Sequence, residues 1–237
     1  MILGSVLGDG SLKINPHYKN ARFSFRHSIK QKDYFFWKVE KIKEISGEKN
    51  WWFQDKNELG GDMLRYQSSA LESLTQLHQL IYKKGKLHIR RKWLNMLTPF
   101  SLAIWWLDDG SLITNGRRGV ICTDSFSYED QKILTRYLHV VWDVKVIIGK
   151  VSRQWKGKKT EYYRLWIRSS EELQKFLRIV LPYVQAPSML PKVLLMYKNS
   201  DLQQRWISEV SQATGFSQEI VQKYLYEKKS RWKIFRE

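Results

Sequence analysis

Two apolar segments of this chain end in the same four residues, Asp-Gly-Ser-Leu, one hundred positions apart. The first reads MILGSVLGDGSL from residue 1 and the second SLAIWWLDDGSL from residue 101, so Asp9 and Asp109 occupy matching places. Self-similarity at a fixed spacing indicates copies of one structural unit. The chain is therefore expected to consist largely of two related halves.

The segments that follow each Asp-Gly pair also correspond. Each half continues with an alternating strand, an amphipathic helix, two more strands and a second amphipathic helix. The strands are expected at residues 21–28, 51–57, 62–69, 119–126, 144–155 and 160–169, and the helices that follow the first strand at 30–45 and 127–142. The predicted order is helix, two strands, helix, two strands, helix, given twice.

These landmarks define the expected domains. Residues 1–90 would form the first half, 91–99 a linker, and 100–198 the second half. Residues 199–237 have no counterpart and form a helical C-terminal extension with Gly215 between two helical patterns. The small Ser211, the turn residue Phe216 and the apolar Val221 resemble a helix-turn-helix spacing. A helical tail packed on the outside of the fold is the favoured interpretation.

The charge of the chain points to an anionic partner. It carries 41 Lys and Arg against 23 Asp and Glu, a formal net charge of +18. Such an excess opposes compaction, and a nucleic-acid backbone is the partner that it suits best. Cys122 is the only cysteine, so an internal disulfide is excluded and a reducing intracellular compartment is expected. No apolar run is long enough for a membrane span, and we expect no targeting peptide.

The position of the two carboxylates has an electrostatic consequence. If each apolar segment is a helix that the following Gly ends in a left-handed cap, Asp9 and Asp109 lie at helix C-termini, where the macrodipole disfavours anions. Gly4 and Gly8 would let the two helices approach closely and bring both carboxylates together. Two like charges that close need a cation, and Mg²⁺ is the hard divalent ion that suits few protein ligands plus water and phosphate.

Residues 1–12 and 101–112 resemble the two signature helices of single-chain LAGLIDADG homing endonucleases, with ILGSVLGDG and LAIWWLDDG in the nine motif positions. The resemblance covers about residues 1–195. It implies an α+β fold of two pseudo-symmetric αββαββα halves, with the signature helices at the interface and the antiparallel sheets forming a DNA-binding saddle. Ile104, Trp105 and Trp106 depart from the pattern by making the second helix bulky. The short first helix, about 12 Å before Asp9, would fit a chain with a further segment upstream.

The resemblance also implies an active site. Asp9 and Asp109 match the catalytic carboxylates, which would ligate two or three Mg²⁺ ions, with Mn²⁺ also expected to support activity. Lys86 in KKGKLHIRRKW and Lys192 in APSMLPKV match the basic residue that such members supply to each site. Gly8 and Asp108, the residues just before the two carboxylates, are further metal-ligand candidates; Asp108 stands where the family usually has a small residue.

DNA recognition is expected on the polar faces of the strands. Alternation places Arg22, Ser24 and Arg26 on one face of their strand, with Phe23, Phe25 and His27 on the other. Arginine and amide side chains on such a face suit base edges and phosphates. The candidate DNA contacts are Arg22, Ser24, Arg26, Arg65, Gln67, Lys145, Arg153, Arg164, Trp166 and Arg168.

The implied function is metal-dependent double-strand cleavage of a long asymmetric DNA target by a monomer, leaving short 3′ overhangs. The resemblance implies intron homing, in an organelle matrix (mitochondrion or chloroplast, organelle-encoded) or a bacterial cytoplasm. One alternative is a maturase that binds group I intron RNA and assists its splicing. Another is a DNA-binding regulator of the same fold that does not cut. The five histidines show no metal-ligand spacing.

Overall fold

The computed structural model describes residues 1–55, 61–113, 116–155 and 157–231 and divides the chain into two compact units. Unit 1 contains Met1–Asp108 and Gln185–Ser188, and unit 2 contains Asp109–Val184 and Met189–Glu237. The division therefore falls at the end of the second Asp-Gly helix rather than in the expected linker, residues 91–99. Part of that linker is a short helix, α4 (Arg91–Leu94), whose Trp93 and Leu94 are buried.

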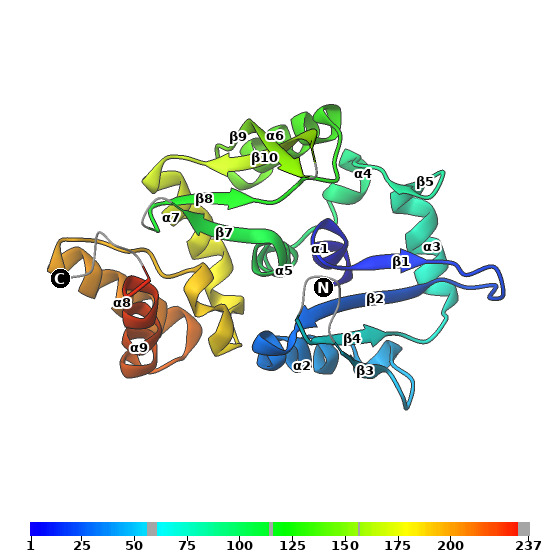
Figure 1. Cartoon of the computed structure of the whole chain (residues 1–237), viewed down its shortest axis with the longest axis horizontal. Helices are drawn as coiled ribbons and strands as arrows, with labels where there is room; N and C mark the ends of the chain where they lie inside the picture. Colours follow the sequence, from blue (N-terminus) through cyan, green and yellow to red (C-terminus); the bar gives the residue numbers. More distant parts are fainter. Residues whose placement is uncertain (56–60, 114–115, 156, 232–237) are drawn as a thin grey trace. The chain divides into compact units, whose positions relative to one another are not determined.

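Unit 1 follows the predicted order of elements (Figure 1). Its sheet has the order β1-β2-β4-β3, and all neighbouring strands are antiparallel. Helix α2 packs on β2 and β4, and α3 packs on β1 and β2. The elements are α1 (Ile2–Leu7), β1 (Ser11–Lys13), β2 (Arg22–Ser28), α2 (Lys32–Lys41), β3 (Trp51–Gln54), β4 (Met63–Gln67), α3 (Glu72–Ile81), the hairpin β5 (Tyr82–Lys83) and β6 (Lys86–Leu87), and α5 (Pro99–Asp109). Short 3-10 turns lie at Ile29–Gln31 and Lys43–Ile45.

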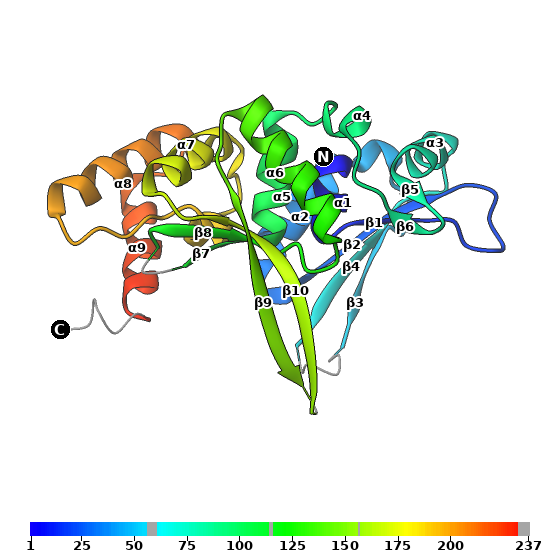
Figure 2. The same ribbon diagram turned by 90° about the horizontal axis from the view of Figure 1, so that it is seen from above.

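Unit 2 repeats this arrangement with the strand order β7-β8-β10-β9. Helix α6 packs on β9 and β10, and α7 packs on β8 and β10. Strands β9 and β10 form a long hairpin that reaches beyond these helices (Figure 2). The elements are β7 (Gly110–Ile113), β8 (Arg118–Ile121), α6 (Tyr128–Trp142), β9 (Ile147–Trp155), β10 (Lys158–Ile167), α7 (Ser170–Val180), the 3-10 turns η3 (Leu181–Tyr183) and η4 (Pro187–Lys192), α8 (Ser200–Thr214) and α9 (Gln218–Lys229).

Alternation along the strands separates a core face from a polar face, as the sequence predicted. On β2 the side chains of Phe23, Phe25 and His27 are buried, whereas Arg22, Ser24 and Arg26 are not. Stacked and tilted aromatic contacts join Phe25 to Tyr66 of β4 and to Phe35 of α2. The helices therefore cover the apolar face, and the opposite face of the sheet keeps its polar side chains.

The glycines of the first Asp-Gly helix let α1 and α5 approach closely. A Cβ at Gly4 would clash with the backbone carbonyl oxygen of Ser101, and a Cβ at Gly8 would lie 2.6 Å from the Cβ of Asp108. The expected left-handed caps after the two Asp residues are wrong. Neither Gly10 nor Gly110 is among the positive-φ glycines of the described residues. Gly10 is needed for space instead, because a Cβ there would lie 2.8 Å from both the Phe23 ring and the Ser5 Cβ.

Substitution of Gly4 by Ala tests this packing. Ala usually stabilises a helix interior by about 1 kcal/mol relative to Gly, but here the new methyl group meets a backbone oxygen that cannot move independently of α5. We expect Gly4→Ala to lower the free energy of unfolding by about 2–3 kcal/mol in urea titrations. Gly61→Ala is the matched control because, apart from its chain neighbours, no atom of the described residues lies within 4 Å of its Cβ position. Equal stability of the two variants would contradict the close packing.

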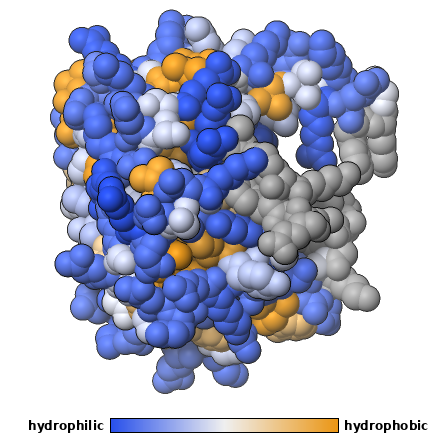
Figure 3. All heavy atoms as spheres, turned by 90° about the vertical axis from the view of Figure 1, so that its left-hand side faces the viewer, coloured by the Kyte–Doolittle hydropathy of each residue, from blue (hydrophilic) through white to orange (hydrophobic). Residues whose placement is uncertain are grey.

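The C-terminal extension forms two helices that pack on unit 2. Gly215 has φ 79°, which ends α8 in a left-handed cap, and Ser217 caps α9. Helix α8 contacts α9 and η3, and Trp206, Val210 and Val221 are buried. On the side that carries these helices, hydrophilic side chains cover most of the face (Figure 3). The arrangement agrees with a helical tail packed on the fold. In the part of the chain that is described, no helix combines the length and apolarity of a membrane span.

A buried lysine makes the stability of unit 2 depend on pH. Burial lowers the pKa of Lys228 from 10.5 to about 7. Between these values the unfolded chain binds the proton and the folded chain does not, so stability rises with pH. Relative to Lys228→Met, the wild-type free energy of unfolding should rise by roughly 1 kcal/mol per pH unit above pH 7. Urea titrations at pH 7, 8 and 9 measure this, and a constant difference between the two proteins would contradict it.

Candidate active site

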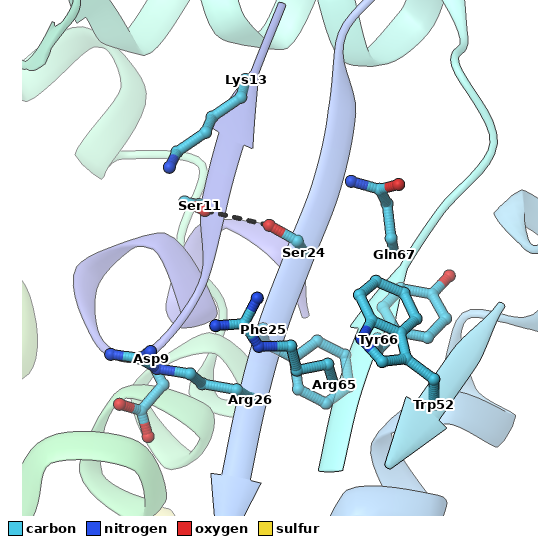
Figure 4. Close-up of a pocket in the computed structure, with 10 residues that line it drawn as sticks. All are labelled: Asp9, Ser11, Lys13, Ser24, Phe25, Arg26, Trp52, Arg65, Tyr66 and Gln67. Carbon is cyan, nitrogen blue, oxygen red and sulfur yellow. Dashed lines mark hydrogen bonds between the residues drawn. The ribbon is translucent and has the colours of Figure 1, made fainter. Parts of the chain in front are cut away.

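The polar face of the first sheet forms a groove that ends at Asp9. Strand register places Ser11 opposite Ser24 and Arg26 opposite Arg65, and their side chains share the face that the helices leave open. Figure 4 shows these residues around the groove. Its lining residues are Asp9, Ser11, Lys13, Ser24, Phe25, Arg26, Trp52, Arg65, Tyr66 and Gln67. A carboxylate thus lies at the edge of a surface dominated by cationic and neutral hydrogen-bonding groups.

Asp9 follows the end of α1 and remains accessible. Its side chain is 40% exposed, and its Oδ2 lies 3.5 Å from Nδ1 of His27. The other ring nitrogen of His27, Nε2, lies 3.8 Å from Oδ1 of Asp108. The histidine is 2% exposed, so it fills the space between an accessible carboxylate and a buried one.

The buried carboxylate of Asp108 belongs to an ion pair under the sheet. Lys38 Nζ of α2 donates to both carboxylate oxygens, at 3.0 and 2.9 Å, and the Tyr34 hydroxyl donates to Oδ1 at 2.8 Å. The side chains of Lys38 and Asp108 are fully buried. Burial, the negative charge of Asp108 and the hydrogen bond to it raise the pKa of Tyr34 well above its usual value, with a smaller contribution from Asp9. Tyr34 therefore stays a hydrogen-bond donor.

These surroundings change the role expected for Asp108. Asp9, His27 and Asp108 offer ligand atoms within 4.8 Å of one another. Lys38 neutralises Asp108, however, and its oxygens already accept the hydrogen bonds of Lys38 and Tyr34. We propose that Asp108 serves mainly this structural ion pair and that Asp9 is the metal ligand of unit 1. Gly8, the other candidate, is the residue that leaves room for the Asp108 side chain.

In unit 2 the corresponding carboxylate is Asp109, which lies beside Cys122. The Cys122 amide donates to the Asp109 carbonyl oxygen at 3.0 Å, and strand register brings Cys122 level with Arg164. Arg164 donates to both oxygens of Asp124, at 2.6 and 2.7 Å. Cys122 therefore takes, beside Asp109, the position that Arg26 takes beside Asp9. The arginine next to Cys122 across the strands, Arg164, is held by its ion pair with Asp124.

The two predicted lysines have different surroundings. Burial raises the pKa of the Cys122 thiol; the charges of Arg164 and Lys192 lower it, and those of Asp109 and Asp124 raise it. Asp109 and Lys192 thus act on the same thiol, which brings this predicted pair into one region of unit 2. Lys86 lies exposed on the β5–β6 hairpin. That hairpin is held to β1 by a hydrogen bond from the Leu12 amide to the Tyr82 hydroxyl, 3.4 Å long.

Most candidate DNA contacts lie on the open faces of the two sheets. Arg22 donates to Gln67 at 3.1 Å along the first sheet. In the second sheet, the side chain of Trp166 lies over Gly149, on the face that also carries Arg153 and Arg164 by register. Arg168 is the exposed residue that follows β10. Lys145 is different: it precedes β9 and lines a groove with Lys132, Arg136 and His139 of α6. It therefore lies beside α6, before the strand begins, and its contact with DNA stays a prediction.

Sequence reasoning missed the residues that support Asp9. His27 was assigned only to the apolar face of its strand, and Lys38 and Tyr34 only to an amphipathic helix. One signal was available. Lys38 lies four residues after Tyr34, on the buried face of the same helix, and a buried lysine needs an anion as its partner. The candidate anion, Asp108, was 70 residues away, and the sequence alone does not reveal that contact.

Together, the two repeats of helix and antiparallel sheet, each with an Asp where its Asp-Gly helix ends, define a known class of protein. The LAGLIDADG DNA endonuclease family matches residues 1–176, and the chain belongs to this family. Among solved structures, the homing endonuclease I-WcaI bound to its DNA recognition sequence shares the fold, with a TM-score of 0.66 at 22% identity. That similarity covers 82% of this chain and 84% of the other.

Two curated relatives extend the comparison. Protein RecA of Mycolicibacterium flavescens is 29% identical over 211 residues, which are 84% of this chain and 46% of that protein. Cytochrome b mRNA maturase bI2 of Saccharomyces cerevisiae is 28% identical over 205 residues, 81% of this chain and 46% of that protein. The chain thus spans about half the length of these relatives.

Proposed function

We propose that the chain is a homing endonuclease that cuts both strands of a long asymmetric DNA target as a monomer. The observation that carries this proposal is the same in each unit: an Asp lies where the Asp-Gly helix ends, two residues past α1 for Asp9 and as the last residue of α5 for Asp109, at the edge of a sheet face that bears arginines. A carboxylate among cations is misplaced for simple DNA binding, because it repels the phosphate backbone. It is well placed for binding a cation that the reaction needs.

The donors fit Mg²⁺. Asp9 offers a carboxylate whose side chain is 40% exposed, in a groove that Ser11 and Ser24 also line, and hard oxygen donors are those that Mg²⁺ prefers. We propose that Asp9 and Asp109 are its protein ligands. When bound, such an ion lowers the pKa of the attacking water and offsets charge on the phosphate. Lys86 and Lys192 would stabilise the negative charge that develops at the phosphate.

The direct test of this function is selection of cleaved sites from a randomised DNA library in the presence of Mg²⁺. We expect a long site without two-fold symmetry, because the two sheet faces carry different side chains, and products with short 3′ overhangs. If the protein cuts no member of the library in Mg²⁺ or Mn²⁺ but binds DNA tightly in EDTA, the non-cutting regulator would be favoured instead.

Arg26 is the best-placed candidate for DNA affinity in unit 1. It is exposed on β2 and lines the groove beside Asp9. Loss of one phosphate or base contact costs about 1–3 kcal/mol, so Arg26→Ala should weaken binding roughly 10- to 100-fold. Gel shifts in EDTA at several salt concentrations measure this, with Arg205→Ala on the exposed side of α8 as the control. Equal affinities of the two variants would remove Arg26 from the interface.

A second candidate function follows from the maturase relative. RNA is a polyanion too, and the excess of positive charge would serve either partner. The two activities can be separated by testing splicing of a group I intron with wild type and with Asp9→Asn. Splicing that persists in this variant, while DNA cleavage is lost, would indicate a chain with both activities.

A further inference from the structure

The segment that carries Lys192 is buried but irregular. After η4 ends at Lys192, residues 193–197 belong to neither helix nor strand, yet Val193, Leu194, Leu195 and Met196 are each at most 2% exposed. Buried backbone carbonyls outside regular structure require donors from elsewhere, because leaving one unpaired costs about 1–3 kcal/mol.

The C-terminal extension supplies these donors. Lys228 Nζ of α9 donates to the carbonyl oxygens of Pro191 and Leu194 at 2.7 and 2.8 Å, the residues on either side of Lys192 and Val193. Trp206 Nε1 of α8 donates to the Val193 carbonyl at 3.1 Å. These contacts hold the backbone immediately before and after Lys192.

A third side chain continues the same pattern further along the segment. Gln203 of α8 donates to the Leu195 carbonyl at 3.1 Å and accepts the Tyr197 amide at 2.9 Å. Lys228, Trp206 and Gln203 are all buried, so water does not compete for these bonds. Side chains from two helices of the extension thus satisfy five backbone groups between residue 191 and residue 197: four carbonyl oxygens and the Tyr197 amide.

We infer that α8 and α9 act as a positioning element for Lys192, so that the extension determines how fast one DNA strand is cut. This rests on the proposed function, because it takes Lys192 as the lysine that acts on the phosphate of one strand. The first half has no counterpart of residues 199–237, so the lysine of that half, Lys86, does not depend on the extension. The extension therefore contributes to the cleavage of one DNA strand and not to that of the other.

The test measures cleavage of each strand separately, in single turnover, with end-labelled target DNA and the full-length chain. Lys192→Met identifies the strand that depends on this lysine. Lys228→Met and Trp206→Phe should slow that same strand roughly 10- to 100-fold and leave the other strand within twofold. Lys223→Met, on the exposed side of α9, is the matched control and should slow neither strand. Equal slowing of both strands by Lys228→Met and Trp206→Phe would overturn the inference.

The double variant Lys192→Met/Lys228→Met separates positioning from a general structural role. If Lys228 acts only through Lys192, the double variant cuts the affected strand no more slowly than Lys192→Met alone. Additive losses would contradict this.

Hydrogen exchange of the free protein gives a readout that needs neither DNA nor metal. The amides of residues 192–197 should exchange faster in Lys228→Met than in Lys223→Met, with the sheet of unit 1 unchanged. A wild-type chain that cuts no DNA would disprove the proposed function. Unchanged exchange of the amides of residues 192–197 would show that Lys228 does not hold this segment, whatever the activity.

Discussion

Replacing Asp9 or Asp109 by Asn should reduce the single-turnover rate of Mg²⁺-dependent DNA cleavage roughly 100- to 1,000-fold. The change keeps the size of the side chain and removes the charge that would hold the cation, which is worth several kcal/mol in the transition state. Stability should not fall, because a carboxylate at the C-terminal end of a helix is disfavoured by the macrodipole. Activity loss with unchanged or slightly raised thermal stability is therefore the expected signature of both variants.

The control for this experiment is an exposed carboxylate outside the two proposed sites. Asp201 lies in the first turn of α8 and is exposed, so Asp201→Asn should retain full activity. DNA binding in EDTA should also be as tight in Asp9→Asn as in wild type, or tighter, because a negative charge beside the phosphates is removed. Full activity in both Asp9→Asn and Asp109→Asn would show that these carboxylates do not carry the reaction.

Lys38→Met should cause the largest loss of stability. It leaves the Asp108 carboxylate buried with the Tyr34 hydroxyl but without its cation, and breaking a buried ion pair costs about 3–5 kcal/mol. For a chain of this size the melting temperature should fall by about 10 °C. The Tyr34 hydrogen bond remains and cannot offset the charge.

Lys41→Met is the matched control, because Lys41 is exposed on the same helix, and it should change stability by less than about 0.5 kcal/mol. Combining Lys38→Met with Asp108→Asn tests the pair itself. The double variant should lose less than the sum of the two single variants, since both charges are then absent. A strictly additive loss would show that the two side chains do not stabilise each other.

The fold could be predicted largely from local pattern. Repetition of the Asp-Gly segments predicted two copies of one unit. Alternation of apolar and polar residues, such as Phe23 and Arg22, predicted which face of each strand is buried. These features depend on residues close together in the sequence. The ends of the Asp-Gly helices were predicted wrongly because glycine has two uses. At Gly10 the absence of a Cβ makes room for Phe23, and no left-handed conformation is involved.

The site was predictable only in part. Asp9, Asp109 and the strand arginines follow from motif and alternation, whereas the connection from Asp9 through His27 to Asp108 and Lys38 depends on contacts between distant segments. The place of Lys145 could not be read from strand alternation, because it lies two residues before β9 begins. The side-chain donors to residues 191–197 could not be predicted either, because every residue has a backbone carbonyl and the sequence does not show which carbonyls accept them. Residues 58–60 and 156 of the expected hairpin turns lie outside the described range.

The central claim is that an accessible carboxylate in each unit holds a divalent cation at a DNA phosphate. The most direct measurement is a crystal structure of the chain with its DNA target and Mn²⁺, with the ions located by their anomalous scattering. We expect ion density about 2.0–2.2 Å from carboxylate oxygens of both Asp9 and Asp109, and the Lys38–Asp108 pair intact. Ions bound only elsewhere, or ligated by Asp108 in place of Asp9, would contradict the account.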